Sequence, residues 1–249
     1  MGLVQTIRDY FDGQKEKKAQ KCAKLVKNPK AIREDRWAAL EYLAHIDDPE
    51  NAIPALLDRF EYSLEHGIND TREKELAMKG IVKYKATAIP YVKEKICKST
   101  RIAWPMKIIQ SVSDEPTVVE TLKSALNFED VSFDQSAVDK NYDILCYLRD
   151  YQLGQFVPKL SRFVTDLDER VRFACAEVLI EQDNNEVPNM LEHLLSDNTE
   201  ENRRIKQTVL RAFLEKKWKV KDASVFAEGK VADSIYINKA NVLEQRASV

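Results

Sequence analysis

Residues able to carry out chemistry are few and scattered along the chain. The three histidines, His45, His66 and His193, are far apart in sequence. A metal site needs clustered His, Cys or carboxylate ligands, and the adjacent pair Glu192-His193 would point about 100° apart on a helix. No phosphate-binding glycine loop, dinucleotide fingerprint or nucleophile elbow occurs. The sequence therefore predicts no catalytic, cofactor-binding or metal-binding residue, and a protein that is not an enzyme.

The cysteines indicate the cellular location, and the overall charge indicates which partners the protein attracts. Cys22, Cys97, Cys146 and Cys175 are widely spaced, with no C-x-x-C pair, so we expect reduced thiols in a cytoplasmic protein. The formal net charge is −2, which provides no overall attraction to nucleic acid. No apolar run approaches the length of a membrane span, and the start of the chain lacks a secretory pattern.

Glycine and proline usage indicates the class of fold. The 249 residues include only 6 Gly and 8 Pro, too few for hairpin-rich β folds or nucleotide-binding α/β folds. The hydrophobic fraction of 44% can build a core, and the charged fraction of 32% can cover it. This composition favours helices joined by short polar turns.

A proline pattern gives the register of an internal repeat. An apolar-Pro-x-apolar motif recurs at Pro54, Pro90, Pro158 and Pro188. Because proline suits the first turn of a helix, each motif predicts the start of a second helix. An amphipathic pattern with apolar residues at i, i+3, i+4 and i+7 lies about a dozen residues upstream of each proline. These first helices are expected around 37–43, 76–82, 144–148 and 171–179, with a further pair over 104–109 and 118–126 and a closing helix over 205–214.

Such short helix pairs cannot bury their apolar faces alone and must stack on one another. We therefore predict an all-α fold, a right-handed α-α superhelix of about five helix pairs plus a closing helix. Ser234 to Leu243 suggests two very short strands around a turn. The expected organisation is N-terminal capping helices with a basic arm over 1–33, the repeat solenoid over 34–218, and a C-terminal cap over 219–249.

One segment carries a family resemblance. Residues 165–179, an Asp-rich turn followed by Val-Arg-x-x-Ala, closely resemble the HEAT-repeat consensus. In that family an Asp and an Arg of successive repeats form a polar ladder, which implies this role for Asp168 and Arg172. The whole chain also resembles uncharacterised bacterial HEAT-repeat domain-containing proteins, through residues 69–75, 101–106 and 203–218. The resemblance implies an armadillo-like fold and a cytoplasmic location, and it implies no reaction.

Charge is unevenly distributed near the N-terminus. Residues 15–36 carry nine Lys or Arg against three acids, whereas residues 34–75 carry twelve acids against four basic residues. One interpretation is a solvated pair of charge-laced helices. The other is a basic arm that folds along the acidic first repeat or reaches an acidic partner.

In HEAT proteins the second helices usually line the concave binding face. Basic and aromatic residues off the apolar stripe of these helices form the candidate partner-binding set, which is Arg59, Tyr91, Lys95, Lys123, Lys159 and Arg162. Arg162 and Tyr91 are the preferred anchors, because Arg and Tyr are enriched at binding hot spots. Acids are interleaved with these residues, among them Asp58, Glu61 and Glu94, and a mildly basic groove is one hypothesis. Trp104 is expected to fill the core rather than serve as an exposed anchor.

The leading functional hypothesis is a non-enzymatic scaffold or adaptor that binds a protein or peptide along its concave face, working as a monomer. A first alternative is a nucleic-acid-binding protein related to the HEAT-like alkylpurine DNA glycosylases, which would require a strongly positive concave face. A second alternative is an accessory subunit of a cofactor-attachment lyase.

Overall fold

The computed structural model describes residues 2–129, 133–196, 203–223, 230–232 and 234–246. The chain divides into two compact units, Met1–Ala125 and Leu126–Val249. This division falls inside the region that the sequence predicts as one solenoid.

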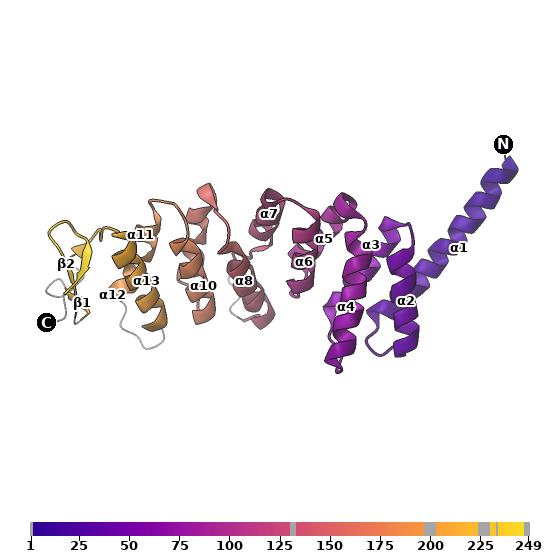
Figure 1. Cartoon of the computed structure of the whole chain (residues 1–249), viewed down its shortest axis with the longest axis horizontal. Coiled ribbons are helices and arrows are strands. Elements are labelled where there is room, and N and C mark those ends of the chain that lie inside the picture. The colour runs from indigo at the N-terminus through magenta and orange to yellow at the C-terminus, as the bar shows by residue number, and fades with distance from the viewer. Residues whose placement is uncertain (1, 130–132, 197–202, 224–229, 233, 247–249) are drawn as a thin grey trace. The chain divides into compact units, whose positions relative to one another are not determined.

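The first unit contains a long helix followed by three helix pairs (Figure 1). The helices are α1 (Gly2–Lys27), α2 (Arg33–His45), α3 (Pro49–Leu57), α4 (Gly67–Val82), α5 (Ile89–Lys98), α6 (Ala103–Val112) and α7 (Glu115–Ala125), with 3-10 turns at Asp58–Glu61 and Lys85–Ala88. The first helices α2, α4 and α6 pack in one row, and the second helices α3, α5 and α7 pack in another. Fully buried Leu40, Ile81 and Ile109 lie on the three first helices.

Helix α1 covers the start of this stack. It is one continuous helix rather than several, and it packs on α2 and α3 through buried Ala19, Cys22 and Val26. The Tyr62 hydroxyl donates to the Val26 carbonyl at 2.5 Å, and Lys27 Nζ lies 3.6 Å from Asp58 Oδ2. Residues 13–27 of α1 therefore pack along the first helix pair through an apolar face, while their lysines are exposed.

Five charged side chains form a buried network between the first two pairs, which we call the Glu73 network (Arg36, Arg59, Asp70, Glu73 and Lys74). Arg36 donates from Nε and Nη2 to the two carboxylate oxygens of Glu73, each at 2.9 Å. Arg59 donates to Glu73 Oε2 and to Asp70 Oδ1, both at 2.7 Å. Lys74 Nζ donates to Asp70 Oδ2 at 2.7 Å. These bonds join α2, the turn after α3, and α4.

The second unit contains two helix pairs, a closing helix and a small sheet. Its first helices α8 (Gln135–Leu148), α10 (Glu169–Ile180) and α13 (Arg203–Lys216) pack side by side, α10 lying between the other two. Its second helices are short and interrupted: a 3-10 turn (Gly154–Leu160) leads into α9 (Ser161–Val164), and α11 (Val187–Leu191) into α12 (His193–Ser196). Buried Leu145, Phe163, Val178 and Phe213 contribute to its core.

The prolines occupy less uniform positions than the motif predicts. Pro90 and Pro188 lie in the first turn of α5 and α11, as expected. Pro54 lies inside α3, because this helix begins earlier, at Pro49, where the Asp48 carboxylate accepts from the Asn51 N–H. Pro158 lies inside a 3-10 turn.

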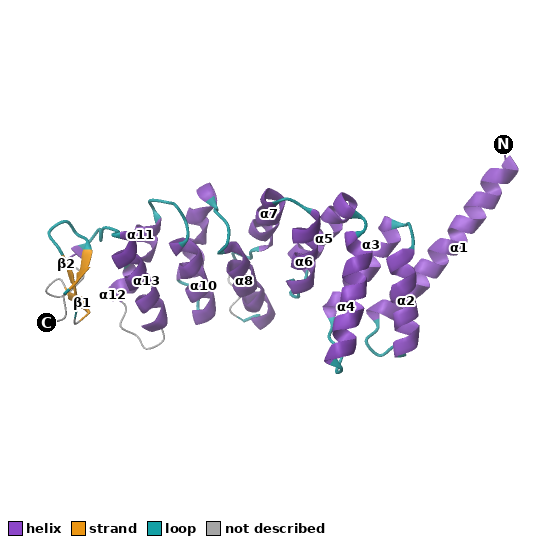
Figure 2. Ribbon diagram, in the orientation of Figure 1, coloured by secondary structure: helices purple, strands orange, loops and turns teal. Residues whose placement is uncertain are grey.

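The C-terminal segment forms a three-stranded antiparallel sheet, one strand more than the sequence predicts. Figure 2 shows its strands in orange. Its order is β1 (Lys230–Ala232), β2 (Ile235–Ile237) and β3 (Leu243–Gln245), with Tyr236 opposite Glu244. The Asn238 side chain accepts from the N–H groups of Ala240 and Val242 and so shapes the hairpin turn. The sheet packs on α13 through β3.

Side-chain bonds organise the Asp-rich turn of residues 165–168 and the start of α10. Asp168 caps α10 by accepting from the N–H groups of Arg170 and Val171. Arg172 donates to the carbonyls of Asp166 and Leu167 in its own turn. Arg170 pairs with Asp168 at 2.9 Å in its own turn and with Asp139 of the neighbouring helix α8 at 2.8 Å.

The predicted fold class is confirmed: the fold is all-α, with a small C-terminal hairpin that is part of the sheet. In the parts of the chain that the structure describes, no helix combines the length and apolarity needed to cross a membrane.

Gly80 gives a first test of the packing between α2 and α4. A Cβ at this position would lie 2.8 Å from the Ala44 Cα and 2.9 Å from a Leu56 methyl. We expect Gly80→Ala to lower the free energy of unfolding by about 1–3 kcal/mol, despite a helix-propensity gain of about 1 kcal/mol. Gly13→Ala in α1, where nothing lies within 4 Å, is the matched control. Equal stability of the two variants in urea unfolding would contradict this packing.

The Glu73 network also predicts a pH dependence. Burial alone would raise the pKa of Asp70, but hydrogen bonds from Lys74, Arg59 and the Leu64 N–H lower it below its ordinary 3.8. The stabilisation is therefore complete above pH 3.8 and is lost as the pH falls through the folded-state pKa. Asp70→Asn should cost about 2 kcal/mol at pH 7, and this difference from the wild type should shrink in acid.

The measurement is urea unfolding of wild type and Asp70→Asn at several pH values between 7 and 3. Exposed Glu120 supplies the control, since Glu120→Gln should change the unfolding free energy by less than about 0.5 kcal/mol throughout. A cost of Asp70→Asn that stays constant down to pH 3 would show that the carboxylate charge does not stabilise the fold.

Candidate functional site

An open groove on the second helices of the first unit brings together two of the residues that the sequence singled out. Its volume is about 520 Å³. We call it the Tyr91 groove, and it is lined by Pro54, Leu57, Asp58, Glu61, Tyr91, Glu94, Lys95, Lys98, Ser99 and Thr100. Tyr91 and Lys95 belong to the predicted partner-binding set, and both are half-buried.

The sequence of α5 explains why Tyr91, Lys95 and Lys98 face the groove. Buried Val92 and Ile96, at i and i+4, fix the helix against the core. Tyr91, Lys95 and Lys98, at i, i+4 and i+7, then share a neighbouring face. Pro54 and Leu57 reach the groove from α3, so apolar surface comes from both helices.

The charges in the groove are paired, which corrects the hypothesis of a mildly basic groove. Lys95 Nζ lies 2.6 Å from Glu61 Oε1 and 3.2 Å from Asp58 Oδ1. Lys98 Nζ donates to Glu94 at 2.5 Å, and this bond lowers the pKa of the Glu94 carboxyl and raises that of Lys98. The groove therefore offers apolar surface between alternating charges of both signs.

Arg59 does not belong to the binding surface, contrary to the sequence prediction. Its side chain is 0% exposed and is held by Glu73 and Asp70 in the Glu73 network. The α-helical register places Arg59 off the apolar stripe, but α3 ends at Leu57 and the 3-10 turn changes the direction of the side chain. A guanidinium enclosed in this way cannot reach a partner.

Arg162, the other preferred anchor, stabilises the second unit. Its guanidinium donates to the carbonyls of Phe128 at 2.9 Å and Glu129 at 2.7 Å, and it is paired with Asp166. The side chain is 28% exposed. Most of its donors are therefore already used within its own unit.

The remaining residues of the predicted set lie apart from the groove lining. Lys123 is half-buried on α7. Lys159 belongs to the second unit, where it is exposed and lies 5.4 Å from the centre of the Phe156 ring. Trp104 stacks on buried Phe60 with ring centres 5.8 Å apart, in keeping with the expected packing role.

Sequence reasoning missed the apolar contribution to the groove. The sequence pattern predicts Pro54 and Leu57 as part of the repeat motif and its buried stripe, yet both also line the groove. Ser99 donates from Oγ to Glu61 at 3.2 Å and fixes one edge. No local sequence signal marks these residues, because the groove exists only where α3 and α5 are packed together.

Across the residues that the structure describes, no group of three or more His, Cys, Asp or Glu side chains is arranged to hold a metal ion. Cys175 is buried, and burial raises the pKa of its thiol.

No protein-family model matches this chain, and no curated protein or solved structure is significantly similar to it.

Proposed function

We propose that this protein is a non-enzymatic helical scaffold that binds an extended segment of a protein partner in the Tyr91 groove. The observation that carries the proposal is the groove itself, which combines an apolar floor with paired charges along its edges. Its volume of about 520 Å³ lies within the range of sites that enclose a ligand or a few side chains.

Tyr91 is the proposed anchor. It is half-buried between the apolar residues Pro54 and Leu57 and the charged end of α5. A tyrosine offers a large rigid face and a hydroxyl at low conformational cost, which is why tyrosine is common among residues that dominate binding energy. The lysines and acids that pair with one another in the free protein can instead bond the backbone and the polar side chains of a bound peptide at the rim of the groove.

The charge pattern favours protein over nucleic acid. A nucleic-acid backbone requires a continuous positive surface, whereas the carboxylates of Asp58, Glu61 and Glu94 lie among the lysines of this groove. The alternative of a glycosylase-like nucleic-acid binder is therefore less well supported. No specific contact in the described residues favours the lyase-subunit alternative.

The proposal includes the repeat type and the location. The two rows of first and second helices in the first unit support the assignment of these pairs as HEAT-type repeats. The cysteines are dispersed, and two of them are buried as free thiols. This pattern supports a cytoplasmic location.

The test is affinity capture from a native lysate with the purified chain and its Tyr91→Ala variant. Because loss of a hot-spot tyrosine costs about 2 kcal/mol, we expect the variant to retain the partner at least about tenfold less well. Quantitative mass spectrometry measures the retained protein, and circular dichroism confirms that the variant is folded.

Tyr236→Ala is the matched control, since Tyr236 is a half-exposed tyrosine of the C-terminal sheet. It should retain the partner as the wild type does. Equal retention by wild type and Tyr91→Ala would exclude the Tyr91 groove as the binding site. Retention of nucleic acid alone, lost on raising the salt, would instead favour the nucleic-acid alternative.

A further inference from the structure

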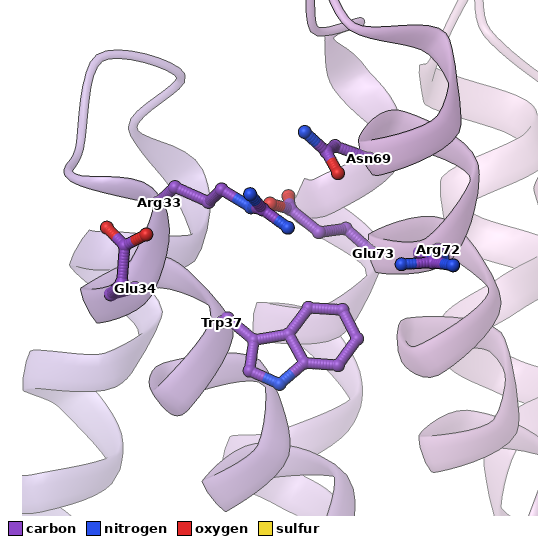
Figure 3. A pocket seen from close by; sticks show the side chains of 6 residues that line it. All are labelled: Arg33, Glu34, Trp37, Asn69, Arg72 and Glu73. Carbon is purple, nitrogen blue, oxygen red and sulfur yellow. The ribbon is translucent and has the colours of Figure 1, made fainter.

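A second cavity of the first unit lies between α2 and α4 and is separate from the Tyr91 groove. Its volume is about 350 Å³. We call it the Trp37 pocket, and six residues line it: Arg33, Glu34, Trp37, Asn69, Arg72 and Glu73. The first three come from the start of α2 and the others from the start of α4 (Figure 3).

Two arginines in this pocket lack protein partners. Within the described residues, neither Arg33 nor Arg72 forms a hydrogen bond or an ion pair, and both are exposed. Figure 3 shows Arg33 extending from α2 towards α4, while Arg72 lies on the opposite side of the cavity. The two guanidinium groups thus flank the space from different helices.

Trp37 supplies a flat apolar surface beside them. The indole is half-buried, has no aromatic partner among the described residues, and borders the cavity below Arg33 in the view of Figure 3. An indole face of this kind stacks on planar rings. The pocket therefore combines a stacking surface with two available guanidinium forks.

The charge balance behind the pocket points to an anion. Glu73 lines the pocket, but its carboxylate is already shared by Arg36 and Arg59. Pocket and network together contain five cationic side chains (Arg33, Arg36, Arg59, Arg72 and Lys74) and three carboxylates (Glu34, Asp70 and Glu73). The buried cations are paired with Glu73 and Asp70, so the surplus of positive charge comes from Arg33 and Arg72, which are exposed at the pocket and attract an anion from solution.

The backbone at this end adds to the positive potential. Neither α2 nor α4 has a side-chain cap at its N-terminus, whereas α8 and α10 are capped by Asp134 and Asp168. The N-terminal N–H groups of a helix and its dipole favour negative charge. Both uncapped helix starts contribute residues to the pocket walls.

From these observations we propose that the Trp37 pocket binds a small ring-bearing oxyanion, a carboxylate or a phosphate monoester attached to a flat ring. The oxyanion is held by Arg33 and Arg72, with the Asn69 amide as a further donor, and the ring packs on Trp37. Guanidinium groups match the geometry of both oxyanions. A volume of about 350 Å³ suits a ligand of this size, at the small end of known ligand sites.

Nuclear magnetic resonance titration of the full chain tests this site directly. The indole N–H signal of Trp37 is assigned by its loss in Trp37→Phe and followed during addition of phenyl phosphate, benzoate and inorganic phosphate. We expect saturable shifts with the two ring-bearing anions, weaker binding of inorganic phosphate, and no saturable shift with benzamide, the neutral analogue of benzoate. The difference between phenyl phosphate and benzoate identifies the preferred oxyanion.

Charge variants complete the test. Arg33→Gln and Arg72→Gln should each weaken binding about tenfold, whereas Glu34→Gln should strengthen it by removing a carboxylate from the rim. Arg149→Gln in the second unit is the control and should leave the Kd unchanged. The proposal is overturned if benzamide binds as benzoate does, if inorganic phosphate binds as tightly as phenyl phosphate, or if both arginine variants retain wild-type affinity.

Discussion

The carboxylate of Glu73 is the point on which the first unit depends. It accepts from Arg36 on α2 and from Arg59 in the turn after α3, while its own backbone belongs to α4. One buried anion therefore links three segments of two successive helix pairs. Removing one partner of a buried ion pair leaves an uncompensated charge, so we expect the arrangement of these segments to depend on all three side chains.

The two candidate binding surfaces lie on either side of this network. The turn Asp58–Glu61 directs Arg59 inward to Glu73, while Asp58 and Glu61 point outward and pair with Lys95 in the Tyr91 groove. On the other side, Glu73 itself forms part of the wall of the Trp37 pocket. The Glu73 network, which holds the helices together, thus also sets the geometry of both binding surfaces.

The second unit is organised by a different set of polar contacts. Asp134 and Asp168 close the starts of α8 and α10, and Arg170 bridges from Asp168 to Asp139. Arg162 ties the carbonyls of residues 128 and 129 to the turn at Asp166. Arg162 and Arg170 are thus engaged inside the second unit, whereas Arg33 and Arg72 of the Trp37 pocket form no hydrogen bond or ion pair with the described residues.

The sequence by itself determined the helical class, the number of helix pairs and the small C-terminal hairpin. Apolar periodicity and the recurring prolines are local signals, and they require only neighbouring residues to be interpreted. The direction of Arg59 was decided by tertiary structure, because a 3-10 turn after α3 and the carboxylates of α4 together draw it inward. The same holds for the Tyr91 groove and the Trp37 pocket, because the walls of each come from helices of two successive pairs and meet only when these pairs pack together.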